Sequence, residues 1–245
     1  MRQVVDEDQI GVLFSGGLDS TIVAILASEL SEVTLYTVGV ENSYDLDAGR
    51  TASELLRIPW KPLVIRREDV LDAVREMVVL TSNRNPVNLS FEIPLFVVSK
   101  YAKEHLLLSG QGADELFAGY ARYMSMTAEE KKKQMDLDLA KLMDLVIEHE
   151  RVIAEYHGRV IRYPFLQPPV LEAVNSIPVE ERTGYGCTKE LLRDVARLVG
   201  AGELADRKKK AAQYGSGVMR VLKAEAKKRG TSVRGLVAEI ARDAL

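Results

Sequence analysis

Short apolar runs alternate with helical segments through the first half of this chain, and this alternation restricts the fold more than any other feature. Strand-like runs occupy 9–15, 33–40, 61–66 and 106–109. Helical periodicity fills the intervals between them, at 20–30, 45–57, 68–80 and 91–105. Strands joined through helices pair in parallel, and such a sheet carries helices on both faces. The sequence therefore predicts an α/β fold with a doubly wound parallel sheet.

Helical periodicity takes over from about residue 125. Met135, Leu139 and Leu142 recur on one helix face, and Leu145 and Val146 continue the pattern. More helices are expected after the stretch RVIRYPFLQPPV. We predict an α/β core over residues 1–124 and a helical subdomain over residues 125–245 that packs against it.

Composition argues against several classes of protein. No apolar run reaches the roughly 18 residues of a membrane span, and the N-terminus lacks a signal-peptide core, so a cytoplasmic protein is expected. Cys187 is the single cysteine and the histidines are scattered, so any metal should be hard and oxygen-bound. The net charge of −3 argues against nucleic acid as a partner. Residues 207–245 nonetheless hold eleven Lys and Arg against three acids, which indicates either a solvated tail or a polyanion-binding face.

The stretch SGGLDS, residues 15–20, lies where the first expected strand turns into a helix. Open parallel sheets bind ligands beyond the carboxyl ends of their strands, where helix N-termini favour anions. Asp19 would repel a phosphate at this point unless a cation such as Mg²⁺ lay between them. We interpret the stretch as a cradle for a magnesium-bound phosphate. The alternative is an ordinary turn in which Ser20 caps the helix.

A second stretch, LLLSGQGADE at 106–115, repeats this design at another strand end. Ser109 and Gly110 follow the apolar run, and Asp114 and Glu115 begin the next helix. Two strand ends of one sheet edge can face the same ion. We therefore expect Asp19 and Asp114 to share one magnesium ion.

Together with RYPFL and RKKKAAQYGSG, these stretches resemble the synthetase domain of the asparagine synthetase family, which includes β-lactam synthetase. That family lies among the PP-loop ATP pyrophosphatases, with an adenine nucleotide alpha-hydrolase-like fold. The motifs follow the family's order over most of the chain. The resemblance implies an enzyme that uses ATP and Mg²⁺ to convert a carboxylate into an acyl-adenylate, releases pyrophosphate, and joins an amine or ammonia to the acyl group.

The resemblance also implies site residues. The pyrophosphate and its metal would be held by Ser15, Gly16, Gly17, Asp19, Ser20 and Asp114. The adenosine pocket would fall at Phe14, Val38 and Gly110. In RKKKAAQY the family pattern R-x-K implies Lys209 as the catalytic cation that stabilises charge on the α-phosphate and acyl adduct, with Lys208 and Lys210 as alternatives.

Three departures from the family concern the substrates. Asparagine synthetases usually begin with a glutaminase domain whose cysteine follows the initiator Met, but residue 2 is Arg. We expect ammonia, another amine or a separate glutaminase subunit to supply nitrogen. The family's proton-accepting Glu is replaced by Gln111, whose amide cannot accept that proton. The positions at which Thr and Arg usually contact aspartate hold Val87, Asn88 and Ser90 in this chain. The identity of the acid substrate is therefore left open.

The favoured function is an ATP-dependent carboxylate–amine ligase, with asparagine formation as the family activity. Its partners are a small carboxylate, an amine, and in some arrangements a second copy of the chain. One alternative is a PP-loop enzyme that modifies tRNA, favoured by the basic stretch. The other is a nucleotide-binding paralogue without ligase activity, favoured by Gln111.

Two further stretches each have two possible interpretations. Tyr163, Pro164 and Phe165 form either part of the acceptor pocket or a packed turn. Gly215, Ser216 and Gly217 either bind phosphate or simply begin a helix.

Overall fold

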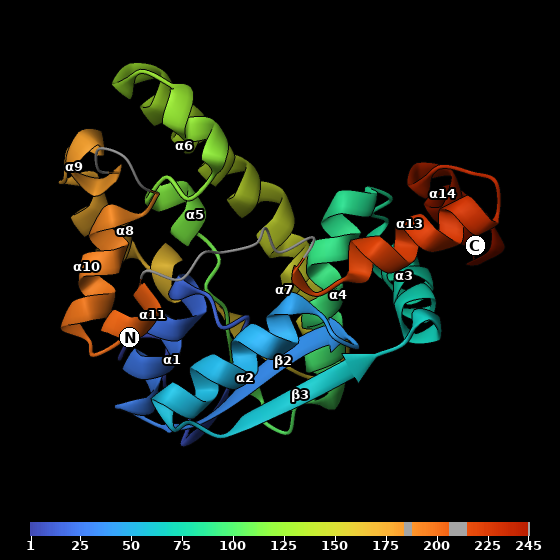
Figure 1. Cartoon of the computed structure of the whole chain (residues 1–245), viewed down its shortest axis with the longest axis horizontal. Coiled ribbons are helices and arrows are strands. Elements are labelled where there is room, and N and C mark those ends of the chain that lie inside the picture. The colour runs from blue at the N-terminus through green and yellow to red at the C-terminus, as the bar shows by residue number, and fades with distance from the viewer. Residues whose placement is uncertain (184–187, 206–214, 245) are drawn as a thin grey trace.

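Five parallel strands form the central sheet of this protein, which is described here from a computed structural model (Figure 1). The structure describes residues 1–183, 188–205 and 215–244. The strand order is β3-β2-β1-β4-β5. The strands are β1 Gln9–Leu13, β2 Glu32–Val40, β3 Trp60–Ile65, β4 Leu106–Leu108 and β5 Val160–Arg162. This parallel sheet confirms the predicted α/β class.

Helices connect the strands in the first half of the chain and dominate the second half. Those before residue 124 are α1 Leu18–Ser28, α2 Tyr44–Leu56, α3 Arg67–Thr81, α4 Pro86–Tyr101 and α5 Ala113–Leu116. The later ones are α6 Ala128–Lys141, α7 Ile147–Tyr156, α8 Pro168–Asn175, α9 Val179–Thr183, α10 Glu190–Leu198, α11 Gly202–Ala205, α13 Val218–Lys228 and α14 Val233–Ala244. Short 3₁₀ turns lie at Ala121–Ser125 and Pro164–Leu166. None of the described helices is long and apolar enough to cross a membrane.

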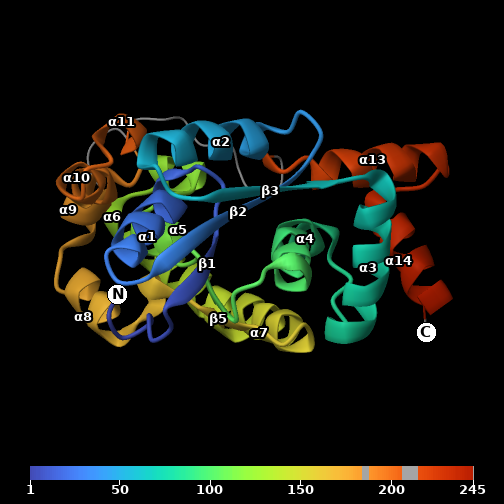
Figure 2. The same cartoon turned by 90° about the horizontal axis from the view of Figure 1, so that it is seen from below.

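Two hydrophobic cores lie on opposite faces of the sheet (Figure 2). Successive residues of β2 point to opposite faces, so Leu35 joins one core while Tyr36 and Val38 join the other. Helices α1, α2, α10 and α11 cover the Leu35 face, and α3, α4, α7, α13 and α14 cover the Tyr36 face. The later helices thus share both cores with the predicted 1–124 unit. The division at residue 124 remains a prediction.

Two helices begin earlier than the sequence predicts. Helix α4 starts at Pro86 because the Asn85 side chain caps it, accepting a hydrogen bond from the backbone N–H of Val87 at 2.9 Å. Helix α1 starts at Leu18, so Ser20 lies inside the helix and does not cap it. Helix α1 also ends at Ser28, earlier than the predicted residue 30, so Leu30 lies beyond it and is 39% exposed.

Residues 125–245 contain two features that helical periodicity does not reveal. Strand β5 pairs in parallel with β4, so this half of the chain completes the sheet. A π-helical turn at Leu142–Val146 joins α6 to α7. The wider turn shifts the helix face, which leaves Leu145 38% exposed although Leu142 is buried.

Candidate active site at the carboxyl edge of the sheet

The SGGLDS stretch forms a tight turn between β1 and α1. Gly16 has φ +70° and packs so closely on α2 that a β-carbon would collide with the backbone of Ala48. Ser20 Oγ donates to the carbonyl oxygen of Gly17 at 3.1 Å and lies 3.5 Å from Ser15 Oγ. Ser15 is exposed and Gly17 is half-buried. The turn is therefore tight and requires glycine at position 16, and its role as a phosphate cradle remains a prediction.

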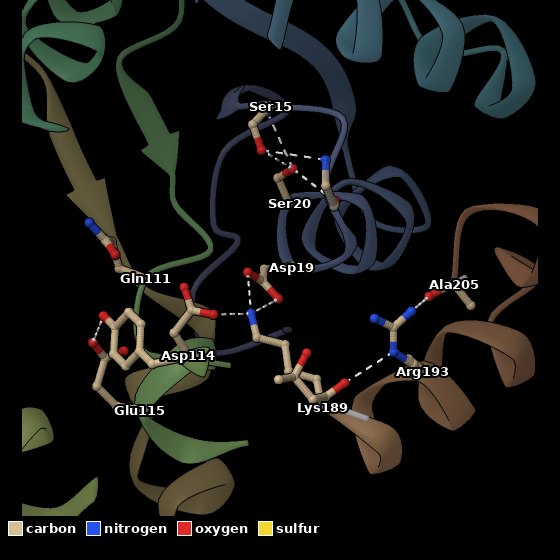
Figure 3. Close-up of polar contacts among 12 residues, drawn as sticks. Ser15, Asp19, Ser20, Gln111, Asp114, Glu115, Lys189, Arg193 and Ala205 are labelled. Carbon is tan, nitrogen blue, oxygen red and sulfur yellow. Dashed lines mark hydrogen bonds and ion pairs between the residues drawn. The ribbon is translucent and has the colours of Figure 1, made fainter. Parts of the chain in front are cut away.

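Asp19 and Asp114 converge on one cation, the ammonium of Lys189 (Figure 3). Lys189 Nζ lies 2.6 Å from both carboxylate oxygens of Asp19 and 2.5 Å from Oδ1 of Asp114. Only 4% of the Lys189 side chain is exposed. The structure thus brings the two predicted metal ligands together and places a third, unpredicted residue between them.

Lys189 is held firmly at the start of α10. Its backbone N–H donates to the carbonyl oxygen of Phe117 at 3.2 Å, and its φ of +59° is in the left-handed region that side chains disfavour. Gly119 lies directly against the pair, because a β-carbon there would collide with Asp114 Oδ1 and Lys189 Cε. These contacts orient the lysine toward the carboxylates.

The carboxylate pair has the chemistry of a magnesium site. Within the described residues no group of three or more His, Cys, Asp or Glu side chains could hold a metal. Mg²⁺ is commonly held by one or two carboxylates together with waters and substrate phosphates. Asp19 and Asp114 already direct their oxygens at a single positive charge. These two residues fit the ion that the family implies.

The residues expected near adenosine are arranged less simply. Gly110 lies beside Asp19, with a hypothetical β-carbon 3.1 Å from Asp19 Cβ. Phe14 and Val38 are only 2% and 4% exposed and belong to different cores, on opposite faces of the sheet. Their side chains pack the interior, so a nucleotide could reach these two positions only through the backbone.

Gln111 contacts a buried carboxylate that the sequence did not point to. Its Nε2 donates to Glu150 Oε1 of α7 at 3.0 Å. Glu150 Oε2 and the hydroxyl of Tyr163, which follows β5, are both buried and have no hydrogen-bond partner in the described part of the chain. In Figure 3 the Gln111 side chain points away from the contacts of Lys189. The edge of the sheet therefore carries a second, separate polar cluster.

Glu150 has an unusual proton affinity. Burial raises the pKa of its carboxyl to about 7, the nearby charge of Glu92 also raises it, and the hydrogen bond from Gln111 opposes the rise. Tyr163 is in turn held protonated, because burial and the charge of Glu150 raise its pKa far above the ordinary value. A carboxyl with a pKa near 7 can exchange protons at neutral pH.

Comparison with known proteins identifies the family. Residues 1–151 and 127–234 match the asparagine synthase family. A Methanocaldococcus jannaschii protein, provisionally named asparagine synthetase (glutamine-hydrolyzing) 1, is 32% identical over 95% of this chain. This chain belongs to the asparagine synthase family.

Two mammalian relatives agree with this assignment. The human and Chinese hamster (Cricetulus griseus) asparagine synthetases, both glutamine-hydrolyzing, are each 28% identical over 79% of this chain. The chain spans 50% of the length of the Methanocaldococcus relative and 37% of the two mammalian ones. The solved NMN synthetase of Francisella tularensis aligns with 98% of this chain and 84% of its own, at 13% identity and a TM-score of 0.47.

Several residues implied by the asparagine synthase resemblance remain predictions. Lys209, with Lys208 and Lys210, lies outside the described residues. Ser216, shortly after that segment, accepts a hydrogen bond from the backbone N–H of Val40 at the end of β2, at 2.9 Å. The Gly215–Gly217 stretch therefore lies at the carboxyl edge, where α13 follows it.

The region that contacts the acid in asparagine synthetases is only partly accessible here. Asn88 lines a cavity of about 580 Å³, together with Arg84, Asn85, His149 and Arg234. Ser90 is fully buried and donates to the carbonyl oxygen of Val87 at 2.7 Å. Of the three residues that stand where the family usually contacts its acid, Asn88 is the one that lines this cavity.

Sequence reasoning missed Lys189 and Glu150. Lys189 lies in an ordinary TKELLR helix start, and Glu150 lies in an acidic helix segment, so neither has a local signal. Both become evident only when distant segments meet: residues 19 and 189, and residues 111 and 150. For the stretch Tyr163–Phe165, by contrast, a packed turn was one of the two predictions, and the structure has a buried 3₁₀ turn there.

Proposed function

We propose that this chain is an ATP-dependent amide-forming ligase of the asparagine synthetase type, in which a carboxylate is activated as an acyl-adenylate. One observation supports this proposal most strongly. Asp19 and Asp114 follow two different strands, and both contact the ammonium of Lys189 beside the Gly16 turn. This arrangement suits the binding of a nucleotide triphosphate with its metal. Family membership supports the same activity.

Asp19 and Asp114 would hold magnesium, which neutralises phosphate charge when bound. The Ser15–Ser20 turn would hold the pyrophosphate. In the first step, a carboxylate oxygen of the acid bonds to the α-phosphorus and the bond to pyrophosphate breaks. Lys209 is proposed to stabilise the negative charge that gathers on the α-phosphate during this exchange.

In the second step the amine nitrogen attacks the acyl carbon, and AMP leaves with the electron pair of the broken C–O bond. The attacking nitrogen must also lose a proton. Gln111 cannot accept it, but Glu150 lies 3.0 Å from the Gln111 amide and has one oxygen without a partner among the described residues. We assign that proton to Glu150 Oε2, with Gln111 positioning the carboxylate through Oε1.

For the nitrogen source and the acid we propose classes of compound and not single substrates. Free ammonia, another amine, or ammonia from a separate glutaminase subunit would all suit this second step. The relatives named above hydrolyse glutamine. Aspartate is the family's acid, and we propose that the cavity lined by Asn88, Arg84 and Arg234 binds an anionic substrate group.

An ATP–pyrophosphate exchange screen over amino acids and small carboxylic acids tests the proposal. Exchange of labelled pyrophosphate into ATP that depends on one acid supports adenylate formation and identifies that acid. Tight MgATP binding without exchange for any acid would instead favour a nucleotide-binding paralogue. Exchange that required tRNA would favour the RNA-modifying alternative.

A further inference from the structure

The ammonium of Lys189 occupies the point at which the two proposed metal ligands meet. Its contacts of 2.5–2.6 Å use both oxygens of Asp19 and Oδ1 of Asp114. Mg²⁺ requires carboxylate oxygens at about 2.0–2.1 Å. An ammonium and a divalent cation bound to these same oxygens would repel each other and compete for them.

We propose that Lys189 is a resident counter-ion that excludes free divalent cations from the site and yields the carboxylates only to a metal that arrives with a nucleotide. The inference rests on the proposed function, because it takes Asp19 and Asp114 as the metal ligands. It adds a selection step: the site distinguishes the metal–nucleotide complex from the metal alone.

Charge balance explains this selectivity. Lys189, Asp19 and Asp114 together carry a net charge of −1, and the ammonium is almost fully removed from water. A free divalent cation that displaced it would leave a buried lysine charge without those two partners, which is costly. A nucleotide brings several phosphate charges, which give the displaced ammonium new partners. Displacement is therefore favourable only when metal and phosphate arrive together.

In this proposal the Lys189 side chain exchanges partners while its backbone stays in place. The Lys189 backbone is fixed by its bond to Phe117 and by the start of α10. Gly119 packs directly against the pair, and a β-carbon there would collide with Lys189 Cε and Asp114 Oδ1. The exchange of partners would require a change of the Lys189 side-chain rotamer.

Manganese binding to the wild type and to Lys189→Met, with and without a non-hydrolysable ATP analogue, provides the test. Met keeps the length of the side chain and removes its charge. We expect Lys189→Met to bind Mn²⁺ without nucleotide at least about tenfold more tightly than the wild type, because the competing cation is gone. Lys132→Met, at a 59% exposed lysine on α6, is the matched control and should behave as wild type.

The outcomes separate the inference from the proposed function. If folded Lys189→Met binds free Mn²⁺ no better than wild type, while wild type binds Mn²⁺ with the analogue, the inference is wrong and the metal site stands. If neither protein binds Mn²⁺ even with the analogue, the metal site itself is wrong.

A second test uses the wild type, so it does not require that the Lys189→Met variant folds. In a spectrum of ¹⁵N-lysine-labelled protein, the ammonium of Lys189 should give a protected signal that Mg²⁺ alone leaves unchanged and that Mg²⁺ with the analogue shifts. A shift caused by Mg²⁺ alone would overturn the inference.

Discussion

Two polar clusters lie at the same edge of the sheet, and they differ in the partners of their carboxylates. In the first cluster, Asp19 and Asp114 share the ammonium of Lys189 at 2.5–2.6 Å. In the second, Glu150 is more deeply buried and faces neutral groups, the Gln111 amide and the Tyr163 hydroxyl, with the Glu92 carboxyl close enough to raise its pKa.

The difference shows how partners determine what a buried carboxylate can do. Carboxylates paired with a cation are suited to hold positive charge, so the first cluster is suited to a metal and phosphates. A carboxyl without such a partner retains its proton to higher pH, so the second cluster is suited to proton transfer. The two steps of the proposed reaction, activation by ATP and attack by an amine, divide between them.

Replacement of a cation-binding acid should have the largest effect. Asp19→Asn and Asp114→Asn should each reduce Mg²⁺-dependent ATP binding and product formation to background, a loss of at least about a thousandfold, since each removes charge that holds the metal. Calorimetry with MgATP measures the binding. Asp136→Asn, at an exposed acid on α6, is the control. Tight MgATP binding by both site variants would refute the assignment.

Removal of the proton acceptor should come next. Glu150→Gln should slow amide formation by about a hundred- to a thousandfold while ATP–pyrophosphate exchange continues, because only the second step uses this carboxyl. In wild type the rate should rise with pH through about 7 as Glu150 loses its proton. Glu150→Asp should recover part of the rate. If Glu150→Gln keeps the wild-type rate and pH profile, another base acts.

Lys209→Ala tests a residue outside the described part of the chain. We expect it to retain ATP affinity and lose product formation by about two to three orders of magnitude, the usual scale for one charge-stabilising group. Lys208→Ala and Lys210→Ala serve as comparisons. If one of these two shows the larger loss, the role belongs to that lysine.

The smallest effect concerns stability. Because the pKa of Glu150 is raised from 4.5 to about 7, the folded chain keeps a proton that the unfolded chain releases as pH rises between these values. Wild type should therefore lose about 3 kcal/mol of stability between pH 4.5 and 7, at about 1.4 kcal/mol per pKa unit. Urea unfolding at pH 5 and pH 8 measures this difference. Glu150→Gln should lack this component, and an unchanged pH dependence in the variant would contradict the burial account.

The sequence predicted what local patterns encode. Alternating strands and helices gave the parallel sheet, and repeated glycine–acid motifs at two strand ends led to Asp19 and Asp114. Strand β5 was missed because three residues between helices carry little periodicity, and the π-helical turn because it breaks the 3.6-residue repeat. Lys189 and Glu150 acquire their roles only through contacts across 170 and 39 residues of sequence.

The central claim, that ATP activates a carboxylate as an adenylate, can be tested by following oxygen atoms. The acid identified by the exchange screen is labelled with ¹⁸O in its carboxylate and incubated with the chain, MgATP and an ammonium salt. The account predicts that AMP gains one labelled oxygen for each amide formed, because the acyl carbon–oxygen bond breaks in the second step. Label in inorganic phosphate with release of ADP, or amide formation without labelled AMP, would contradict it.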